Sequence, residues 1–328
     1  MKIMVSLLAM IIICLPQADS LIVHCTLSIV HSNKGFIMEQ KTIYALGFFD
    51  GVHLGHQALL QACRELADQH GYQAGVVTFT VHPDGLVAGN APRLLNTTED
   101  RRRLLLAYGM NEVIELPFDR QLMQMPWRDF IRMLRGAPYN AVGLVCGNDF
   151  RFGYMGEGTA LILQRYCKAA GMPWTVIPQQ EQNGIRISST RIRELLEDGQ
   201  LEQANRLLGH PHMLTGVVQT GKQLGRTIGF PTANLTFPEG VIVPKFGVYA
   251  CNATFDGKVY AAITNVGSRP TVNGEGVTAE AHILDFDGDL YGKSVTLVFH
   301  KFLRPEKKFD SLEELKAQIA EDIAQVRL

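Results

Sequence analysis

The chain has 328 residues, of which 46% are hydrophobic and 19% are charged, as in an ordinary globular protein. Its 31 basic and 32 acidic side chains balance, which argues against a nucleic-acid partner. A single core rarely grows to this length, so we expect two domains. The 6 cysteines are scattered without a Cys-x-x-Cys pair, and they indicate free thiols in a reducing compartment.

The amino-terminal segment, residues 1–37, has the features of a secretory signal. It contains Lys2, an apolar run over residues 3–15 and a small-residue ending at 18–20. The apolar run is too short to cross a bilayer comfortably. From Met38, a charged start leads straight into a predicted strand. We therefore interpret the segment as upstream sequence and expect a cytoplasmic protein without a membrane anchor.

Strands and helices are predicted to alternate from Thr42 onward. This alternation predicts an α/β domain of the doubly wound, Rossmann-like type, a parallel sheet with helices on both faces that binds nucleotides. The predicted strands are residues 42–49, 74–82, 112–118, 141–147 and 174–178, and the predicted helices are 56–71, 98–109, 127–136, 159–171 and 188–209.

The pattern changes after Pro211. Short strands separated by Gly, Pro and Asp-Gly turns predict a small antiparallel barrel, with residues 282–303 as one of its hairpins. The amphipathic segment 311–328 predicts a terminal helix packed on the outside of the barrel. We place the domain boundary near Gly209, so that the two domains cover residues 38–209 and 210–328.

The stretch GFFDGVHLGHQ, residues 47–57, suggests an anion site. Its glycines allow backbone amides to be exposed where the first strand ends and the next helix begins. His53 and His56 at this helix entrance could donate charge-assisted hydrogen bonds to a polyphosphate. The residues alone leave two alternatives: a zinc pair, which lacks further ligands at suitable spacing nearby, and two histidines that only satisfy a helix start.

Several segments in one order carry a family resemblance. GFFDGVHLGHQ resembles the His-x-Gly-His signature of nucleotidyltransferases, and VTFTVHP, CGNDFRFG and ISSTRIR follow it. From about Thr42 to the C-terminus, the chain resembles the bacterial bifunctional riboflavin kinase/FAD synthetases. The resemblance implies that ATP, Mg²⁺ and flavins are used. In the first domain, the FMN phosphate would attack the α-phosphorus of ATP, and the protein would mainly align two anions.

The resemblance also implies roles for residues of the first domain. His53 and His56 would bind the ATP phosphates and stabilise the departing pyrophosphate, while Ser189 and Arg193 would supply the opposite side. Further candidates for nucleotide or flavin binding are Gly47, Phe49, Asp50, Gly51, Phe79 and Asp149.

The loop at residues 154–158, YMGEG, departs from the family pattern. The family usually has a basic, glycine-flanked loop here, whereas this chain has Glu157. A lost cation would weaken phosphate binding. The loop therefore leaves open a riboflavin kinase whose first domain is weakened or only senses flavin.

The stretch GVVQTGKQLGRTIGFPTANL begins like a P-loop, G-x-x-x-x-G-K. The match fails because Gln223 replaces the Ser or Thr that would hold magnesium, and no helix opens after it. The stretch instead resembles the riboflavin kinase signature, in which the Thr and Asn of Pro-Thr-Ala-Asn hold Mg²⁺-ATP. Thr232 and Asn234 are therefore the metal candidates. The ATP-binding candidates are Gly221, Lys222, Gly225, Arg226 and Gly229.

The segments NVGSRPTV, from Asn265, and AEAHILDFDGDLYGK also resemble the family. Its catalytic Glu maps to Glu280, which would accept the proton of the ribityl hydroxyl as that hydroxyl attacks the γ-phosphate. On strand alternation alone, Glu280 would be a solvated surface residue. Asn265 is a further binding candidate, and Arg304 with the last helix would help to cover the flavin.

Residues 285–296 imitate a calcium loop, but Leu290 stands where an EF-hand needs glycine. We therefore predict a hairpin turn there. The predicted partners are riboflavin, FMN and ATP, with no nucleic acid and no membrane, and self-association is left open. The competing interpretations are another nucleotidyltransferase with a binding-only second domain, and a flavin-sensing module without turnover.

Overall fold

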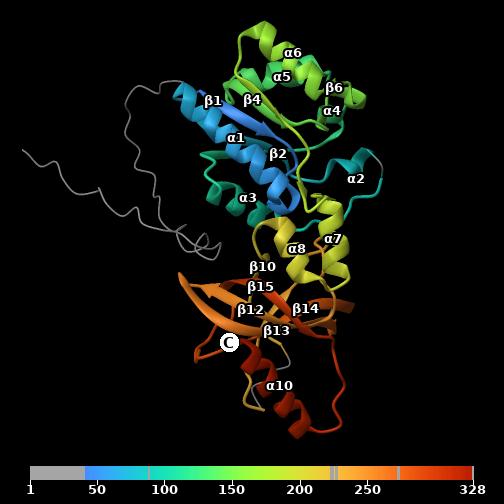
Figure 1. Ribbon diagram of the computed structural model, residues 1–328. Helices are drawn as coiled ribbons and strands as arrows, with labels where there is room; N and C mark the ends of the chain where they lie inside the picture. Colours follow the sequence, from blue (N-terminus) through green and yellow to red (C-terminus); the bar gives the residue numbers. More distant parts are fainter. Residues whose placement is uncertain (1–40, 88, 222–224, 226–227, 272–273, 327–328) are drawn as a thin grey trace, which may run out of the picture.

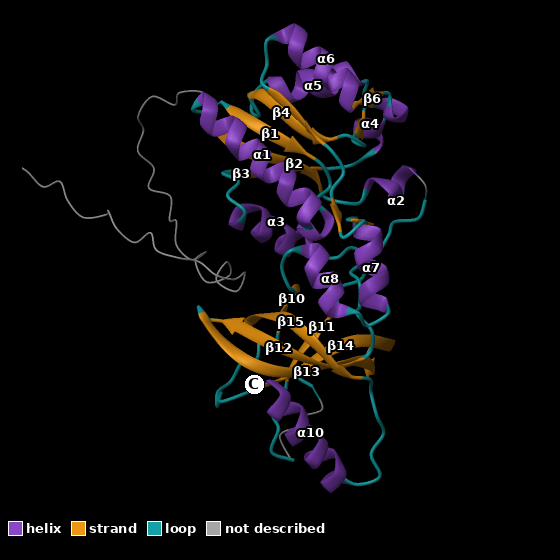
Figure 2. Ribbon diagram, viewed as in Figure 1, coloured by secondary structure: helices purple, strands orange, loops and turns teal. Residues whose placement is uncertain are grey.

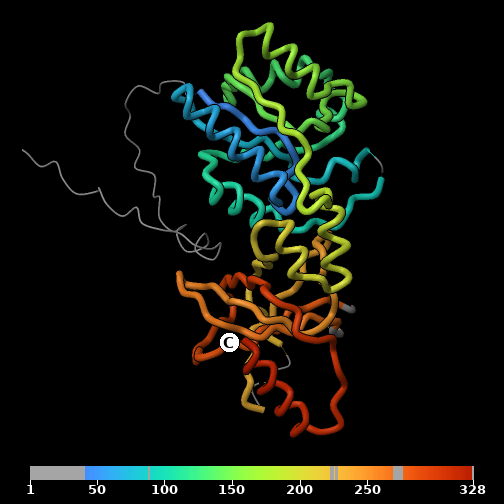
Figure 3. Tube along the Cα trace, viewed as in Figure 1, coloured from blue at the N-terminus to red at the C-terminus, as the bar shows by residue number. Residues whose placement is uncertain are grey.

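The computed structural model describes residues 41–87, 89–221, 225, 228–271 and 274–326 (Figure 1). The predictions for residues 1–37, Lys222 and Arg226 lie outside these residues. The chain forms a parallel sheet with its helices, here called the sheet domain, and an antiparallel sheet, here called the barrel. Figure 3 traces the chain from the sheet domain through two yellow helices into the orange and red barrel. The predicted fold class is confirmed.

The sheet domain contains a five-stranded sheet in the order β3-β2-β1-β4-β7, and every pairing in it is parallel. Its inner strands β1, β2 and β4 are mostly apolar and buried, as expected when both faces are covered. They are β1 Thr42–Leu46, β2 Gln73–Phe79, β3 Glu112–Leu116, β4 Ala141–Gly147 and β7 Trp174–Ile177. The helices are α1 Leu54–His70, α2 Pro83–Val87, α3 Thr98–Ala107, α4 Arg120–Met123, α5 Trp127–Arg135 and α6 Ala160–Ala170.

Alternate residues of β1 face two separate cores, because successive side chains of a strand point to opposite faces. Ile43 and Ala45 pack with buried residues of α1 and α3. Tyr44 and Leu46 pack with buried residues of α5 and α6. The central strand is therefore buried on both faces, and its carboxyl end is held rigidly where His53 and His56 follow.

The barrel contains six strands in the order β10-β15-β12-β13-β14-β11. An isolated bridge between Gln219 and Asn234 joins its two edges and nearly closes it. The predicted hairpin at residues 282–303 is wrong, because β14 and β15 are not neighbours and residues 284–293 connect two separate parts of the sheet. The strands are β10 His212–Val217, β11 Ala233–Thr236, β12 Gly247–Phe255, β13 Lys258–Thr271, β14 Gly274–Ile283 and β15 Ser294–Arg304.

Two helices, α7 Ser189–Glu197 and α8 Leu201–Leu208, lie between the sheet domain and the barrel (Figure 2). The sequence pattern predicted one helix here, but Gly199, with φ of 78°, breaks it in two. Their apolar side chains share one core with the inside of the barrel. The terminal helix α10, Leu312–Val326, lies on the far side of the barrel, as expected. No helix in the described part of the chain is long and apolar enough to cross a membrane.

A second link between the sheet domain and the barrel runs through Leu94. Its amide donates to the Gly240 carbonyl at 2.7 Å, and its carbonyl accepts from the Ile242 amide at 2.8 Å. The next residue, Leu95, is fully buried in the core that α7, α8 and the barrel share. The joint between the two units is therefore packed and hydrogen-bonded. The remaining short elements are η2 Asp50–Val52, η3 Tyr154–Gly156, β5 Arg151–Phe152, β6 Gly158–Thr159, β8 Glu181–Gln182 and β9 Ile185–Arg186.

Candidate active sites

The first site is a cavity of about 240 Å³ at the carboxyl ends of β1, β4 and β7, here called the histidine cavity. Ligands of open parallel sheets bind at this edge. The predicted residues that line it are Gly47, His53, His56, Asp149 and Ser189. Further lining residues include Phe48, Gly55, Asn148, Gln180 and Arg186.

The two histidines are stacked, with ring centroids 3.7 Å apart. The Nδ1 atom of His53 accepts the backbone N–H of His56 at 3.3 Å and so caps α1. Burial lowers the pKa of His53 to about 4. Burial, together with the neighbouring His53 and Arg101 side chains, holds the pKa of His56 well below its usual value. Both rings are therefore neutral at pH 7, and Nε2 of His53 carries its proton. The predicted charge-assisted bonds would need an anion to raise these pKa values.

The turn before the histidines is held mainly by packing. Phe49 has φ of 60° and is fully buried, so its ring lies in the core and does not line the cavity. Gly51 has φ of 78°, a conformation that a side chain strongly disfavours, and a Cβ there would meet Leu95. Phe49 and Gly51 were predicted as ligand contacts, but the structure places both behind the cavity wall.

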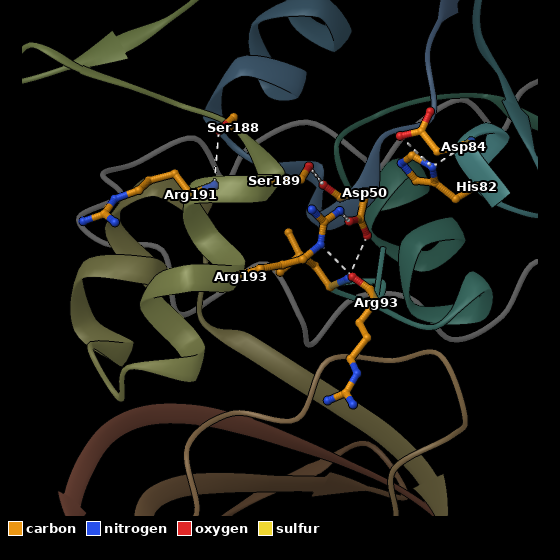
Figure 4. A network of polar contacts seen from close by, with 9 residues as sticks. Asp50, His82, Asp84, Arg93, Ser188, Ser189, Arg191 and Arg193 are labelled. Carbon is orange, nitrogen blue, oxygen red and sulfur yellow. Dashed lines mark hydrogen bonds and ion pairs between the residues drawn. The ribbon is translucent and has the colours of Figure 1, made fainter. Parts of the chain in front are cut away.

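Asp50, Ser189 and Arg193 form a partly buried network beside this turn (Figure 4). The Ser189 hydroxyl donates to the Asp50 carbonyl at 2.9 Å, and Arg193 Nη2 lies 2.7 Å from the Asp50 carboxylate. Arg193 Nε also donates to the Arg93 carbonyl at 2.6 Å. Burial raises the pKa of Asp50 although the Arg193 ion pair opposes the shift. The three residues thus join α7 to the turn.

Arg193 does not line the histidine cavity. It lines a neighbouring polar pocket of about 410 Å³ with His82 and Asp84, and Ser189 lies on the wall between the two. Figure 4 shows His82 and Asp84 near this network. Phe79, at the end of β2, stacks edge-on with Phe118, 5.2 Å between centroids, and it is not part of either wall.

The unusual loop with Glu157 also lies away from the histidines. Of the described residues that line the histidine cavity, none falls in residues 154–158. Asp149 lines the cavity and lies 3.5 Å from Arg186 at its exposed mouth. The acidic substitution in the loop therefore does not place a negative charge in the cavity wall.

The second site is a cavity of about 320 Å³ between the barrel and α10, here called the barrel cavity. Glu280, His282, Asn265 and Thr232 line one side, and residues of the segment after β15 line the other. Five of the ten predicted residues of the second domain line this cavity: Gly225, Thr232, Asn265, Glu280 and Arg304. The residues on the helix side include Arg304, Glu306, Lys307, Phe309, Leu315, Ile319 and Asp322.

The strand register aligns four predicted residues in one row. Asn234 of β11 is opposite Glu280 of β14, and Glu280 is opposite Asn265 of β13. Asn265 is in turn opposite Val248 of β12, which pairs with Arg304 of β15. Directly opposite residues of antiparallel strands share a face. Single positions from five strands, between residues 234 and 304 of the sequence, thus lie on one line across the sheet.

Arg304 does not reach into the cavity as a free cation. Its guanidinium makes a two-pronged ion pair with Asp322 of α10, at 2.7 to 3.1 Å, and Asp322 is 1% exposed. The guanidinium also lies 5.8 Å from the centroid of the Phe309 ring. The pair therefore fixes α10 over the cavity, while the covering of a flavin by Arg304 and the helix stays a prediction.

A third cavity, of about 310 Å³, lies against the connection between β14 and β15, here called the loop cavity. It is lined by Val218, Phe286 and Tyr291 among others, and it shares Thr232 with the barrel cavity. Gly225 lines the barrel cavity, whereas Gly229 is exposed with φ of 91°. If each of the two cavities held a ligand, the two ligands would therefore come close to one another at Thr232.

The residues at this junction suit a magnesium ion. Thr232 offers a hydroxyl, and Asn234, 8% exposed, donates through Nδ2 to the Thr232 carbonyl at 3.3 Å and so has its amide oriented. Gly221 packs so closely against this amide that a Cβ would lie 2.6 Å from it. Neutral oxygen donors with room for phosphates and water are the ligands that Mg²⁺ accepts.

Comparison with known proteins agrees with this geometry. A family model described as FAD synthetase matches residues 37–191, and one described as riboflavin kinase matches residues 208–328. The bifunctional riboflavin kinase/FMN adenylyltransferase of Escherichia coli K12 is 40% identical over 286 residues, which cover 87% of this chain and 91% of the relative. The chain belongs to the bifunctional riboflavin kinase/FMN adenylyltransferase family.

Other relatives support the same assignment. The bifunctional riboflavin kinase/FMN adenylyltransferase of Bacillus subtilis is 34% identical over 305 residues, which cover 90% of this chain and 95% of the relative. A crystal structure of a Streptococcus pneumoniae protein described as a macrolide-efflux protein has a TM-score of 0.78 and 32% identity, covering 88% of this chain and 94% of that one. The arrangement of sheet domain and barrel is thus shared with that structure.

Among the lining residues of the barrel cavity that the sequence reasoning missed are two acidic ones, Glu306 and Asp322. Asp322 follows Leu315 and Ile319 at helical spacing, and all three line the cavity. An acidic residue on an otherwise apolar helix stripe was the signal that could have identified it. Glu306, which accepts from the Asn265 amide at 3.2 Å, has no such signal because it lies between elements.

Proposed function

We propose that the protein makes FAD from riboflavin in two ATP-dependent steps, phosphorylation in the barrel and adenylyl transfer in the sheet domain. The observation that carries this proposal is the row of paired positions that joins Asn234, Glu280, Asn265 and Arg304, the last three of which line the barrel cavity. The same chain has the stacked histidines at the edge of a parallel sheet. Each step thus has a cavity of its own. We place the boundary between the domains at Gly209.

In the kinase step, riboflavin would occupy the barrel cavity under α10, and ATP would occupy the loop cavity. Thr232 lies on both walls, so the ribityl hydroxyl and the γ-phosphate would meet beside it. Glu280 would accept the hydroxyl proton during attack. Thr232 and Asn234 would hold Mg²⁺, which neutralises charge on the phosphates. Burial of the flavin by the Arg304–Asp322 pair and α10 would exclude water.

In the adenylyl step, ATP would lie in the histidine cavity with its phosphates at the amino end of α1, where backbone N–H groups point outward. His53 is buried, His56 is half-buried and both are neutral, so they would donate hydrogen bonds as charge develops on the leaving pyrophosphate. The FMN phosphate would attack the α-phosphorus from the side of Ser189. Arg193 would act mainly by fixing Asp50, its partner at 2.7 Å.

The proposed place of the reaction is the cytoplasm, where ATP and reduced thiols are available. The described cysteines are all buried and free, which fits a reducing compartment.

The direct test supplies riboflavin, ATP and Mg²⁺ and separates the products by chromatography. Formation of FMN followed by FAD is the expected result. FMN without FAD would leave a riboflavin kinase with an inactive first domain, the alternative raised by Glu157. Unchanged riboflavin would contradict both steps and favour a flavin-binding protein.

A further inference from the structure

The turn that presents the histidines has a strained backbone. Phe49, Gly51 and Val52 have φ values of 60°, 78° and 41°. A β-branched residue such as Val52 is very rarely found at positive φ. Such backbone persists only where the surrounding structure over-determines it, and it concentrates at functional sites. The contacts that hold this turn therefore bear directly on the placement of His53 and His56.

Each carbonyl of residues 48–52 has a hydrogen-bond partner. Four of the five partners are side chains, and three of these, Thr78, Ser189 and His210, are distant in sequence. Carbonyls held in this way are turned toward the interior of the protein. The donors are Thr78 Oγ1 to Phe48 O at 2.8 Å, Val52 N to Phe49 O at 3.1 Å, Ser189 Oγ to Asp50 O at 2.9 Å, His210 Nε2 to Gly51 O at 2.9 Å, and Gln57 Nε2 to Val52 O at 2.9 Å.

His210 is the donor that comes from beyond the end of the sheet domain. It follows Gly209 at the junction with the barrel, and it is 9% exposed. Its Nδ1 atom lies 2.8 Å from the Pro211 carbonyl. Burial lowers the pKa of His210, and the neutral ring has one N–H, so it donates to one of the two carbonyls. We assign the proton to Nε2, the tautomer that gives the Gly51 carbonyl its donor.

Two neighbours anchor the junction at the same point. Gln57 donates to the Leu208 carbonyl at 2.7 Å as well as to the turn. Gly209, with φ of 74°, packs directly against Leu54 and Gln57, which leaves no room for a side chain. The junction is therefore docked on the residues that flank the histidines.

We infer that His210 is a positioning residue for adenylyl transfer, through which the start of the barrel holds the histidine-bearing turn of the other domain. This inference rests on the function proposed above for the histidine cavity. His210 does not line that cavity and does not touch the reacting atoms. It acts on Gly51, which is two residues from His53. Without the hydrogen bond, the buried Gly51 carbonyl would lack a donor, and the strained peptide would be free to rotate.

The test compares His210→Leu, His210→Gln and His212→Leu in the full-length chain. His210→Leu removes the donor, and His210→Gln keeps an N–H that can reach Gly51. His212 is the matched control, because it is also a buried histidine of the junction but neither ring nitrogen has a partner. FMN adenylylation and riboflavin phosphorylation are both measured in each variant, so that the kinase step reports correct folding.

We expect His210→Leu to lower kcat for FAD formation about tenfold or more, the loss expected for a misplaced catalytic group, with FMN formation within about twofold of wild type. His210→Gln should recover most of the activity, and His212→Leu should match wild type. Hydrogen exchange of the amides of residues 48–53 gives a second measurement that does not depend on turnover. Exchange there should be faster in His210→Leu only.

Equal FAD formation by His210→Leu and wild type would overturn the inference, and so would equal losses in the two leucine variants. A wild-type protein that makes no FAD would instead refute the proposed function, while the exchange measurement would still decide whether His210 holds the turn. If His210→Leu does not fold, His210→Asn replaces it, because its amide is too short to reach Gly51.

Discussion

The histidine cavity takes its central residues from one short stretch of chain, whereas the barrel cavity collects them from strands far apart in sequence. His53 and His56 lie three positions apart on one turn and the start of α1. In the barrel, Asn234, Glu280 and Asn265 meet only because β11, β14 and β13 pair in one register. The first kind of site depends on local backbone shape, and the second depends on strand pairing.

The two sites also differ in their charges. The histidine cavity contains buried rings that are neutral, since burial lowers their pKa values. The barrel cavity is covered by a fully formed ion pair, Arg304 with Asp322. Mutations in one cavity should therefore lower one activity and leave the other nearly unchanged.

Replacing His53 and His56 together by alanine should remove FAD formation, by about a thousandfold or more, because the donors to the leaving pyrophosphate are lost. FMN formation should persist, since the barrel cavity lies on another scaffold. Steady-state assays of both products on one preparation measure this. Parallel loss of both activities would show that the division of labour is wrong.

Glu280→Gln should lower FMN formation about a hundredfold to ten-thousandfold, the usual contribution of a general base. The amide keeps the shape of the side chain but cannot take the hydroxyl proton. Adenylylation of supplied FMN should be nearly unchanged. Kinase turnover close to wild type would exclude Glu280 as the base.

Asp322→Ala should raise the KM for riboflavin roughly tenfold, because Arg304 loses its buried partner and α10 is no longer fixed over the cavity. The exposed neighbour Glu321 offers a matched control, and Glu321→Ala should bind riboflavin normally. Titration of riboflavin in the kinase assay measures both variants. An unchanged KM in Asp322→Ala would show that α10 does not cover the flavin.

His212 should make a small, pH-dependent contribution to stability. Burial lowers its pKa to about 3 in the folded protein. The unfolded chain therefore binds more protons below about pH 6.5, and stability falls as the pH drops from there toward 3. His212→Leu should remove about 1 kcal/mol of the fall between pH 8 and pH 6. Denaturant unfolding at the two pH values measures it, and identical pH dependence of the two proteins would contradict the assignment.

The sequence predicted what depends on local patterns. Apolar runs predicted the five strands of the parallel sheet, and a continuous motif predicted the pair His53 and His56. The connection from β14 to β15 was misinterpreted because Asp-Gly turns are typical of hairpins, whereas pairing partners are decided by the whole sheet. The split at Gly199 was missed because the apolar spacing continues across it.

Within the sites too, residues in sequence motifs were predicted, whereas contacts between distant residues were not. Glu280, Asn265 and Thr232 were predicted from family motifs, and the structure brings them to one cavity. That Arg193 pairs with Asp50 could not be predicted, because no local pattern links residues so far apart. No sequence pattern predicted a role for His210, because its role depends on the Gly51 carbonyl, which only the fold brings next to its ring.

The pairing of Leu94 with Gly240 and Ile242 has a consequence for engineering. Residues 92–95 belong to the first half of the gene but fit against a loop encoded in the second half. A chimera that swaps barrels between homologous enzymes should therefore inherit residues 92–95 and 240–242 from a single parent. Recombination at Gly209 alone would join mismatched surfaces, even though both halves were individually sound.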